Sequence, residues 1–403
     1  MPTVLVANRG EIARRVFRTA KRLGLRTVAV YSDADVGAPY VREADVALRL
    51  GPAPAAESYL SSERILGAAR EAGADLIHPG YGFLAEDARF ARAVIAAGLR
   101  FVGPSPEVLA AMGDKAEAKA IAERAGVPVL PGHRGGDQRD ETFIAAAARV
   151  GYPVMVKPAG GGGGIGMQLV RDEASLREAL ARARRAATAA FGDERLLLER
   201  AVAAPRHVEV QVLGDTHGTV VALGERDCSA QRRHQKLLEE TPSPALDQRH
   251  REQLRGAAIA LARAARYTNA GTVEFIVDER GGFFFIEVNA RLQVEHPITE
   301  AVHDIDLVEQ QLRVTLGKGL SSVTDAPHGC AIEARIYAED PAAGFLPSTG
   351  RLVHVRWPDG VRVDAGVEEG SVVTRHYDPL LAKVVARGND RAAALGKLAR
   401  ALA

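Results

Sequence analysis

The first hundred residues alternate short apolar runs with longer amphipathic stretches, and this alternation limits the possible folds more than any other feature. Strand-like runs lie at residues 4–7, 27–31, 75–78 and 101–103. One helix is expected to begin after Asn8-Arg9-Gly10-Glu11 and to end near Leu23, and two more are expected at 58–72 and 87–97. Strands joined by helices at this spacing form βαβ units, so we predict an α/β fold that opens with a parallel, doubly wound sheet.

Length and charge narrow the class of protein. The chain has 403 residues, with 52 Lys and Arg against 51 Asp and Glu, and two cysteines. This length predicts two or three domains, and the balanced charge argues against a dedicated nucleic-acid binder. Two cysteines exclude a disulfide scaffold and suit a reducing compartment. No apolar run approaches the ~20 residues that cross a bilayer, and the start lacks the pattern of a signal peptide. We therefore expect a cytoplasmic enzyme without nucleic-acid or membrane partners.

The turn after the first strand tests one familiar alternative, a dinucleotide site. Asp33 and Asp35 follow the second strand, where a ribose ligand would stand in such a site. The turn itself reads Asn8-Arg9-Gly10-Glu11 and lacks the three spaced glycines that bring a backbone close to pyrophosphate. The sequence therefore disfavours a dinucleotide site at this position.

A run of five glycines, residues 160–164, follows a strand expected at 154–157. Glycines contribute no side-chain packing, but their N–H groups can approach a phosphate closely, and Lys157 adds a positive charge beside them. The run is not a Walker A loop, because the lysine precedes the glycines and Gly-Lys-Ser/Thr is missing. A surface linker is the alternative. The flanking strand patterns favour a lid hairpin over nucleotide phosphates.

Residues 272–277 and 283–289 have the pattern of a β-hairpin around a turn centred on Arg280 and Gly281. That turn pairs Val277 with Phe284 and Glu274 with Glu287, and Asn289 lies on the same face as Glu287. Two facing carboxylates repel each other unless a cation lies between them. Oxygen ligands of this kind suit Mg²⁺ or Mn²⁺ beside nucleotide phosphates, whereas two solvated acids are the alternative.

Directly after the hairpin comes Asn289-Ala290-Arg291-Leu292-Gln293-Val294-Glu295-His296-Pro297. If the chain stays extended, the odd positions from Glu287 to Glu295 face one way. Arg291 and Gln293 could then hold a small planar oxyanion whose proton Glu295 accepts. A charged surface strand would carry the same residues.

A dense polar cluster occupies residues 225–236 and contains Cys228. So many basic groups argue against a core position, and near phosphates they could neutralise charge that develops on transfer, although a solvated face is the usual reason for such a run. Cys228 has no local partner for zinc and is expected to be structural. After Lys318 the chain becomes richer in β-structure, with strands expected at 332–337, 351–356 and 384–387.

Together these stretches resemble the biotin carboxylase family of the ATP-grasp superfamily. The resemblance rests on the glycine run, on the 225–236 cluster and on the following segments: Ala7-Asn8-Arg9-Gly10-Glu11-Ile12-Ala13, His78-Pro79-Gly80-Tyr81-Gly82-Phe83-Leu84, Met112-Gly113-Asp114-Lys115, Pro205-Arg206-His207-Val208-Glu209, residues 287–297 and Ala338-Glu339-Asp340-Pro341. It implies a pre-ATP-grasp domain at 1–113, an ATP-grasp domain at 114–316 with a mobile lid at about 130–203, and a β-rich C-terminal domain, incomplete here, at 317–403.

The resemblance also implies a set of site residues. Biotin would meet Arg335, and the metal, two Mg²⁺ or Mn²⁺ ions, would be held by Glu274, Glu287 and Asn289. Bicarbonate would be bound by Lys236, Arg291, Gln293, Val294 and Glu295, with Arg291, Glu295, Lys236 and Arg335 as catalytic residues. ATP would be bound by Lys115, Lys157, Gly163, Gly164, Met167, Glu199, Arg200, Val202, His207, Gln231, His234, Glu274 and Glu287.

The implied reaction is ATP-dependent carboxylation of biotin by bicarbonate through carboxyphosphate. No Glu-Ala-Met-Lys-Met-like stretch for attaching biotin occurs in this sequence, so the resemblance places biotin on a separate carboxyl carrier, with a carboxyltransferase as a further partner and a homodimer as the expected assembly. Another ATP-grasp carboxylate or amine ligase, or a catalytically weak nucleotide-binding scaffold, remains an alternative. Ile165 stands where the family commonly has Lys or Arg.

Overall fold

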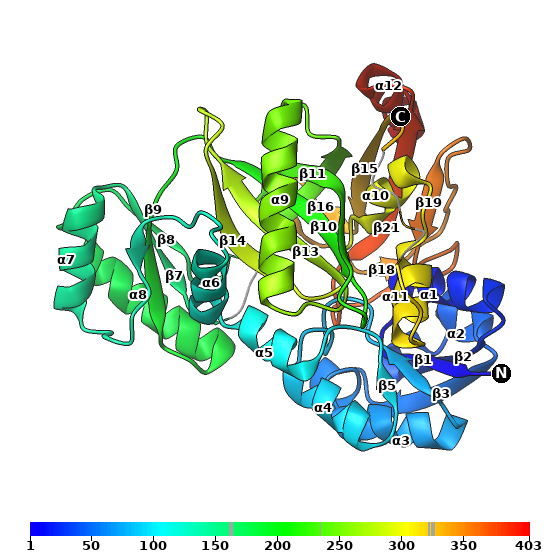
Figure 1. Cartoon of the computed structure of the whole chain (residues 1–403). Helices are drawn as coiled ribbons and strands as arrows, with labels where there is room; N and C mark the ends of the chain where they lie inside the picture. Colours follow the sequence, from blue (N-terminus) through cyan, green and yellow to red (C-terminus); the bar gives the residue numbers. More distant parts are fainter. Residues whose placement is uncertain (161–163, 234, 321–322, 324–326) are drawn as a thin grey trace.

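The computed structural model describes all residues except 161–163, 234, 321–322 and 324–326, and Figure 1 shows the arrangement of its elements. The N-terminal part contains a five-stranded sheet in the order β3-β2-β1-β4-β5, with every pair parallel. Its strands are β1 (Thr3–Val6), β2 (Arg26–Ser32), β3 (Val46–Gly51), β4 (Leu76–His78) and β5 (Arg100–Phe101). The predicted parallel, doubly wound sheet is confirmed, although β3 was missed.

Helices surround this N-terminal sheet. They are α1 (Gly10–Arg22), α2 (Pro39–Glu43), α3 (Ser62–Ala72), α4 (Ala88–Ala96) and α5 (Pro106–Gly113). Helix α3 begins four residues later than predicted, because the Ser61 side chain accepts a hydrogen bond from the Arg64 N–H and so caps the helix there.

A side lobe stands apart from the rest of the molecule at the left of Figure 1. Its four-stranded sheet has the order β6-β9-β7-β8 and is covered by two helices that contribute Phe143 and Leu180 to a separate apolar core. The strands are β6 (Gly132–His133), β7 (Val154–Pro158), β8 (Gln168–Val170) and β9 (Leu196–Arg200), and the helices are α7 (Asp140–Val150) and α8 (Leu176–Phe191). The short helix α6 (Lys115–Arg124) precedes the lobe.

The largest sheet, here called the central sheet, is antiparallel and has the order β14-β13-β10-β11-β12-β15-β21-β19. The β12–β15 pairing joins the middle of the chain to its C-terminal part, so both share one sheet. Its strands are β10 (Arg206–Gly214), β11 (Val220–Arg232), β12 (Gln235–Thr241), β13 (Asn269–Val277), β14 (Phe283–Asn289), β15 (Cys330–Tyr337), β19 (Arg362–Ala365) and β21 (Leu380–Gly388). Helices α9 (Gln248–Ala264), α10 (His296–His303), α11 (Leu307–Thr315) and α12 (Arg391–Leu402) pack around it.

The predicted strand at 351–356 is wrong. Only the two residues of β18 (Gly350–Arg351) pair there, with β20 (Val372–Val373), and one further pair, β16 (Glu339–Asp340) with β17 (Leu346–Pro347), lies nearby. Beyond Leu352, whose N–H donates to the Ser371 carbonyl, Val353 is 83% exposed. Directly beyond Arg351 the chain therefore has no neighbouring strand among the described residues, and Val353 faces solvent.

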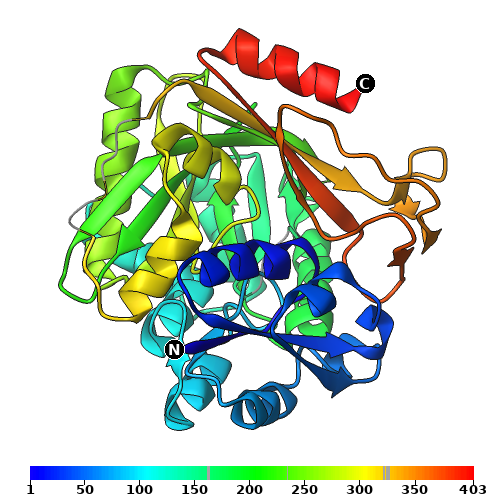
Figure 2. The same cartoon turned by 90° about the vertical axis from the view of Figure 1, so that its right-hand side faces the viewer.

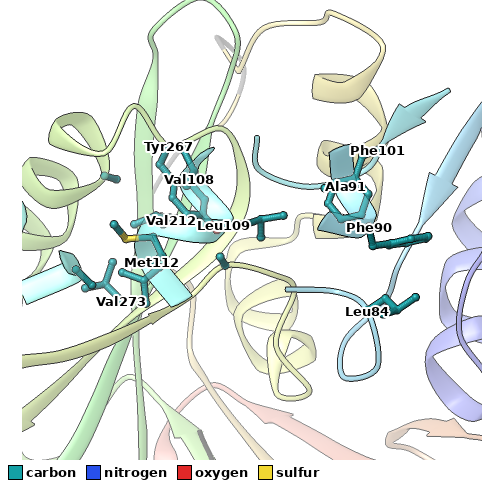
Figure 3. Close-up of a cluster of buried hydrophobic side chains, with 14 of the residues drawn as sticks. Leu84, Phe90, Ala91, Phe101, Val108, Leu109, Met112, Val212, Tyr267 and Val273 are labelled. Atoms are coloured by element: carbon teal, nitrogen blue, oxygen red, sulfur yellow. The ribbon is translucent and has the colours of Figure 1, made fainter. Parts of the chain in front are cut away.

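The N-terminal part and the central sheet share one apolar core. Figure 3 shows Val108, Leu109 and Met112 of α5 beside Val212 of β10 and Val273 of β13. The same cluster continues into the N-terminal part through a second set of labelled side chains, namely Leu84, Phe90, Ala91 and Phe101. Because the core is continuous, α5 fixes the N-terminal sheet against the strands that carry the polar site.

A buried ion network holds α1 to the rest of the chain, and Figure 2 shows this helix between the N-terminal sheet and the C-terminal strands. Arg15 donates to Glu300 at 2.5 Å and to Asp306 at 2.8 Å. Burial raises the pKa of Asp306, but Arg15 and Thr19 hold it down at about 2. Glu300 also accepts from Arg362 of β19 at 2.8 Å, so three distant segments meet through one set of charges. In the described ranges no helix combines the length and the apolar character needed to cross a membrane.

Replacing Arg15 tests this network. We expect Arg15→Leu to lower the free energy of unfolding by roughly 3 kcal/mol, because it removes the buried cation that Glu300 and Asp306 share. Arg22 is the matched control, since it also pairs with Asp306 but its side chain is 55% exposed. Arg22→Leu should cost less than about 1 kcal/mol. Urea unfolding followed by circular dichroism measures both; equal losses would contradict a special role for the buried pair.

Candidate functional site

The hairpin of β13 and β14 brings Glu274 opposite Glu287, as predicted, but the register of the pairs near the turn differs from the prediction. The turn is centred on Arg280 rather than between Arg280 and Gly281: the Asp278 N–H donates to the Gly282 carbonyl, and Gly281 adopts a positive φ of 78°. Val277 therefore pairs with Phe283 rather than Phe284. The register then shifts between the Phe275–Phe285 and Glu274–Glu287 pairs, so that Ile286 is the extra residue of a β-bulge. The bulge restores the facing carboxylates.

These carboxylates open into a cavity of about 650 Å³ between the side lobe and the central sheet. The cavity gathers most of the predicted site from segments far apart in the sequence. Its lining includes the following predicted residues: Lys115, Lys157, Gly164, Met167, Arg200, Val202, His207, Gln231, Lys236, Glu274, Glu287, Asn289, Arg291, Gln293, Val294 and Arg335. Glu199 and Glu295 are fully buried behind it. Gly163 and His234 lie outside the described residues.

Glu274 is the most heavily contacted carboxylate of the cavity. It accepts from His207 Nε2 at 2.7 Å, from Lys236 Nζ at 2.9 Å and from Asn289 Nδ2 at 2.8 Å. Burial alone would raise the pKa of Glu274, but Lys236 and His207 bring it well below the usual range. Burial acts in the opposite sense on the pKa of His207, which the carboxylate nevertheless raises. Glu274 is therefore ionised at neutral pH.

Across the hairpin, Glu287 Oε2 lies 3.1 Å from Lys115 Nζ. The two carboxylates thus each have a lysine partner, and both side chains line the cavity together with Asn289. Three oxygen-bearing side chains on neighbouring strands match the ligand preference of Mg²⁺ or Mn²⁺. The donor set therefore fits a divalent cation held beside phosphates.

Lys236 of β12 joins three buried carboxylates. Its Nζ lies 2.5 Å from Glu209, 2.9 Å from Glu274 and 2.7 Å from Glu295. Burial would lower the pKa of Lys236, but the three carboxylates raise it well above the usual value. The ammonium group is therefore permanently charged and fixes three strands of the sheet at one point.

Glu295 lies between two cations at the end of the cavity. Its second oxygen accepts from Arg335 Nη2 at 3.0 Å, while Arg335 Nε donates to Glu239 at 2.7 Å. Burial would raise the pKa of Glu295, but Lys236 and Arg335 lower it well below the usual value. Burial likewise raises the pKa of Glu239, which reaches about 7 despite Arg335. Of these two carboxylates, Glu295 is therefore ionised at neutral pH, whereas the pKa of Glu239 lies near neutrality.

The chain from Asn289 to Glu295 does not continue as an extended strand, which corrects the sequence prediction. Strand β14 ends at Asn289, and Glu295 is the N-cap residue of α10, where Pro297 fits the first turn. The predicted side chains converge nevertheless. Arg291 donates to Asn289 Oδ1 and to Gln293 Oε1, both at 2.8 Å. A compact turn, rather than strand alternation, aims them into the cavity.

The polar cluster at 225–236 is only partly a surface feature. Arg226 is fully buried and donates to Glu209 at 2.5 Å, contrary to the expectation that the cluster lies outside the core. Two further side chains of the central sheet, Gln211 and Thr272, also accept from Arg226. Cys228, for which a structural role was predicted, is also buried, with Sγ 3.9 Å from Glu295.

Sequence reasoning missed several residues of the site, namely Glu86, Lys119, Glu209, Arg226 and Glu239. Glu86 of the N-terminal part accepts from Arg291 Nε at 2.9 Å. Glu209 could have been found, because it shares one face of β10 with His207 and Gln211, opposite the valines, and this alternation predicts a polar face. Glu86 carries no comparable signal, since its place depends on how the N-terminal part packs.

Three parts of the chain match known protein families, and the whole chain is similar to curated proteins. Residues 1–109 match the family described as "Biotin carboxylase, N-terminal domain", and residues 333–403 match "Biotin carboxylase C-terminal domain". Residues 114–323 match "Carbamoyl-phosphate synthase L chain, ATP binding domain". A biotin carboxylase from Halalkalibacterium halodurans is 50% identical over 403 residues, which cover 99% of this chain and 89% of that protein.

The chain belongs to the biotin carboxylase family. It is also 53% identical to the mitochondrial methylcrotonoyl-CoA carboxylase subunit alpha of Oryza sativa over 99% of its own length, although it spans only 55% of that curated relative. A solved structure with a TM-score of 0.96 and 44% identity covers 99% of this chain and 89% of its own. Its title describes a dimer of the biotin carboxylase domain of Hydrogenobacter thermophilus 2-oxoglutarate carboxylase with MgADP, ADP and bicarbonate.

Family membership fixes the fold class. The N-terminal sheet lies in the biotin carboxylase N-terminal domain, the side lobe and the β10–β14 part of the central sheet in the ATP-grasp domain, and β15 onward in the C-terminal domain. The central sheet therefore crosses a domain boundary.

Proposed function

We propose that this chain carboxylates biotin with bicarbonate at the expense of ATP, as a ligase that forms a C–N bond. The observation that carries the proposal is the buried Glu295 between Lys236 and Arg335, at the end of a cavity that also contains the carboxylate hairpin. An anion site, a base and a group that can stabilise an enolate-like oxygen thus lie together. Another ATP-grasp ligase would need the nucleotide residues but not the pairing of Glu295 with Arg335.

Nucleotide binding is proposed for the side of the cavity formed by the side lobe. Lys157 and Lys115 offer charge to phosphates, and Met167 and Ile276 give apolar lining for a base. The other proposed ATP residues, including Arg200, Val202, His207 and Gln231, line the same cavity. Mg²⁺ or Mn²⁺, held by Glu274, Glu287 and Asn289, would supply charge to the transferring phosphoryl group.

Bicarbonate is proposed to bind between Lys236 and Arg291, beside Gln293 and the backbone of Val294. Glu295 accepts its proton, and the freed oxygen attacks the γ-phosphorus while ADP leaves. An anion at this position competes with Glu295 for Lys236, which weakens the interaction that lowers the pKa of Glu295. Substrate binding therefore increases the basicity of the residue that must take the proton.

Carboxyphosphate formed in this way breaks down to CO₂ and phosphate. The phosphate takes the proton from the biotin ureido nitrogen, which attacks CO₂ to form the new C–N bond. Arg335 offsets the negative charge on the ureido oxygen, and Arg291 orients the reacting groups. A closed side lobe would limit access of water to the unstable intermediate.

The proposal also covers the domain boundaries of the chain and the proteins with which it would act. We propose domains at 1–113, 114–316 and 317–403, with the lid at about 130–203. Biotin would arrive on a carrier domain, a carboxyltransferase would use the product, and the chain would form a homodimer like the dimer named for its structural relative. The predicted cytoplasmic location stays a prediction, since the rice relative is named mitochondrial.

The assay that tests the proposal is ATP hydrolysis with and without bicarbonate and free biotin. We expect turnover to require bicarbonate and to increase with biotin. Turnover insensitive to biotin would refute the proposal in favour of another ligase. ATP binding without any turnover would instead support the scaffold alternative.

Removing the proposed base gives a sharper test. We expect Glu295→Gln to lower turnover by ~10²–10⁴-fold, the usual contribution of a positioned general base. ATP affinity, measured by calorimetry, should stay within about threefold, because Glu295 lies behind the anion site and not beside the phosphate-binding lysines. A large loss of ATP binding would contradict the role of Glu295 as a base.

The pKa of Glu239 predicts a pH dependence. Below about pH 7 Glu239 becomes protonated, its bond to Arg335 weakens, and turnover should fall; above it the carboxylate holds Arg335. Glu239→Gln resembles the protonated form, so the ratio of wild-type to variant kcat should rise from near 1 at pH 6 to ~10 at pH 8. Glu240→Gln is the control, because its side chain pairs with Arg391 on the outer helix α12. A flat ratio for Glu239→Gln would refute the assignment.

The metal assignment is tested by Mn²⁺ binding in the presence of ADP, followed by electron paramagnetic resonance. Glu287→Gln should weaken Mn²⁺ binding by roughly tenfold or more, since even groups behind metal ligands contribute this much. Glu279→Gln, at the exposed tip of the same hairpin, should leave it unchanged. Equal effects of the two variants would exclude a specific site at Glu287.

A further inference from the structure

Lys119 is buried, which is unusual for a lysine side chain. It lies on α6, is only 1% exposed, and does not line the cavity. Burying an ammonium group is costly, and burial lowers the pKa of Lys119 even though a carboxylate opposes the shift. No step proposed above uses Lys119, so its burial requires another explanation.

The partner of Lys119 is Glu199 of β9, which is fully buried. Lys119 Nζ lies 2.6 Å from Glu199 Oε1, and Lys157 Nζ lies 2.8 Å from Glu199 Oε2. Burial would raise the pKa of Glu199, but the two lysines bring it down to about 2. One carboxylate therefore stands between two ammonium groups, and only Lys157 reaches the cavity.

The net charge of Lys119, Glu199 and Lys157 affects the electrostatic potential in the part of the cavity that Lys157 reaches. With both lysines present, Lys119, Glu199 and Lys157 sum to a charge of +1. Without Lys119, the Glu199 carboxylate would cancel Lys157, and the group would be neutral. In a poorly screened interior this difference acts strongly on an anion that approaches Lys157.

Lys119 is also fixed in position by the central sheet. Its Nζ donates to the Phe285 carbonyl at 3.3 Å and lies 5.7 Å from the centre of the Phe285 ring. Phe285 belongs to β14, the strand that carries Glu287, whereas Glu199 and Lys157 belong to the side lobe. The ammonium group therefore connects the two walls of the cavity.

We propose that Lys119 is a positioning residue for phosphate binding: it neutralises Glu199, so that Lys157 presents an uncancelled positive charge to the phosphates of the nucleotide. The inference rests on the proposed use of ATP at this cavity and adds a role for a residue outside it. A purely structural Lys119 would affect every ligand of the cavity alike. The charge role affects only ligands that carry phosphate.

The experiment compares ATP with adenosine, each titrated calorimetrically into the full chain. We expect Lys119→Met to weaken ATP binding by ~10-fold or more and adenosine binding by less than about twofold, because only the phosphates sense the lost charge. Adding Glu199→Gln to this variant restores the +1 charge and should return ATP affinity to within about threefold of wild type. Arg124→Met removes an exposed charge from the same helix and should change neither ligand.

Equal losses of ATP and adenosine, or a double variant as weak as Lys119→Met, would overturn the inference while leaving the proposed function intact. If Lys119→Met does not fold, the single variant Glu199→Gln tests the charge role instead. Lys119 and Lys157 then carry a net charge of +2, so weaker ATP binding in this variant than in the wild type would refute the charge role. A wild-type chain that binds no ATP would instead refute the proposed function, and the inference with it.

Discussion

The architecture depends on burying more carboxylates than a protein interior tolerates without cations. Glu209, Glu274 and Glu295 come from two strands and a helix start, and all three contact Lys236. Each would repel the others if left uncompensated, so the four groups must be placed together or not at all. This requirement fixes β10, β12 and β13 relative to α10. The cavity lies beside this charge cluster, and Lys236 and Glu274 form part of its lining.

The same rule explains how distant parts reach the site. Arg335 enters from the C-terminal domain because β15 pairs with β12, and its guanidinium bridges Glu239 and Glu295. Glu86 enters from the N-terminal domain and holds Arg291. In the side lobe, Glu199 lies between Lys119 and Lys157. Ion pairs thus lie at the two junctions between domains and between the side lobe and the rest of its own domain.

Sequence patterns predicted the local elements well where one face of a strand or helix is buried. The parallel N-terminal sheet follows from periodicity, whereas the facing of Glu274 and Glu287 was predicted with the wrong register near the turn. Periodicity failed where the partner is missing, as at 351–356, where Val353 is exposed. It also failed at Arg226, because a residue type alone does not reveal that Glu209 and its neighbours surround it. Sequence reasoning did not reveal the bulge at Ile286, because the error in the turn centre and the missing bulge shift the predicted register in opposite directions.

The sequence by itself determined the family, the hairpin carboxylates and the motif that leads to Glu295, since these lie within short stretches of chain where spacing sets geometry. Only the tertiary structure decided that Lys236, Glu209 and Arg335 surround Glu295, and that Glu199 lies between Lys119 and Lys157. The reason is physical. Local spacing fixes which face a side chain occupies, whereas the identity of a buried charge's partner depends on how segments far apart in the sequence pack together.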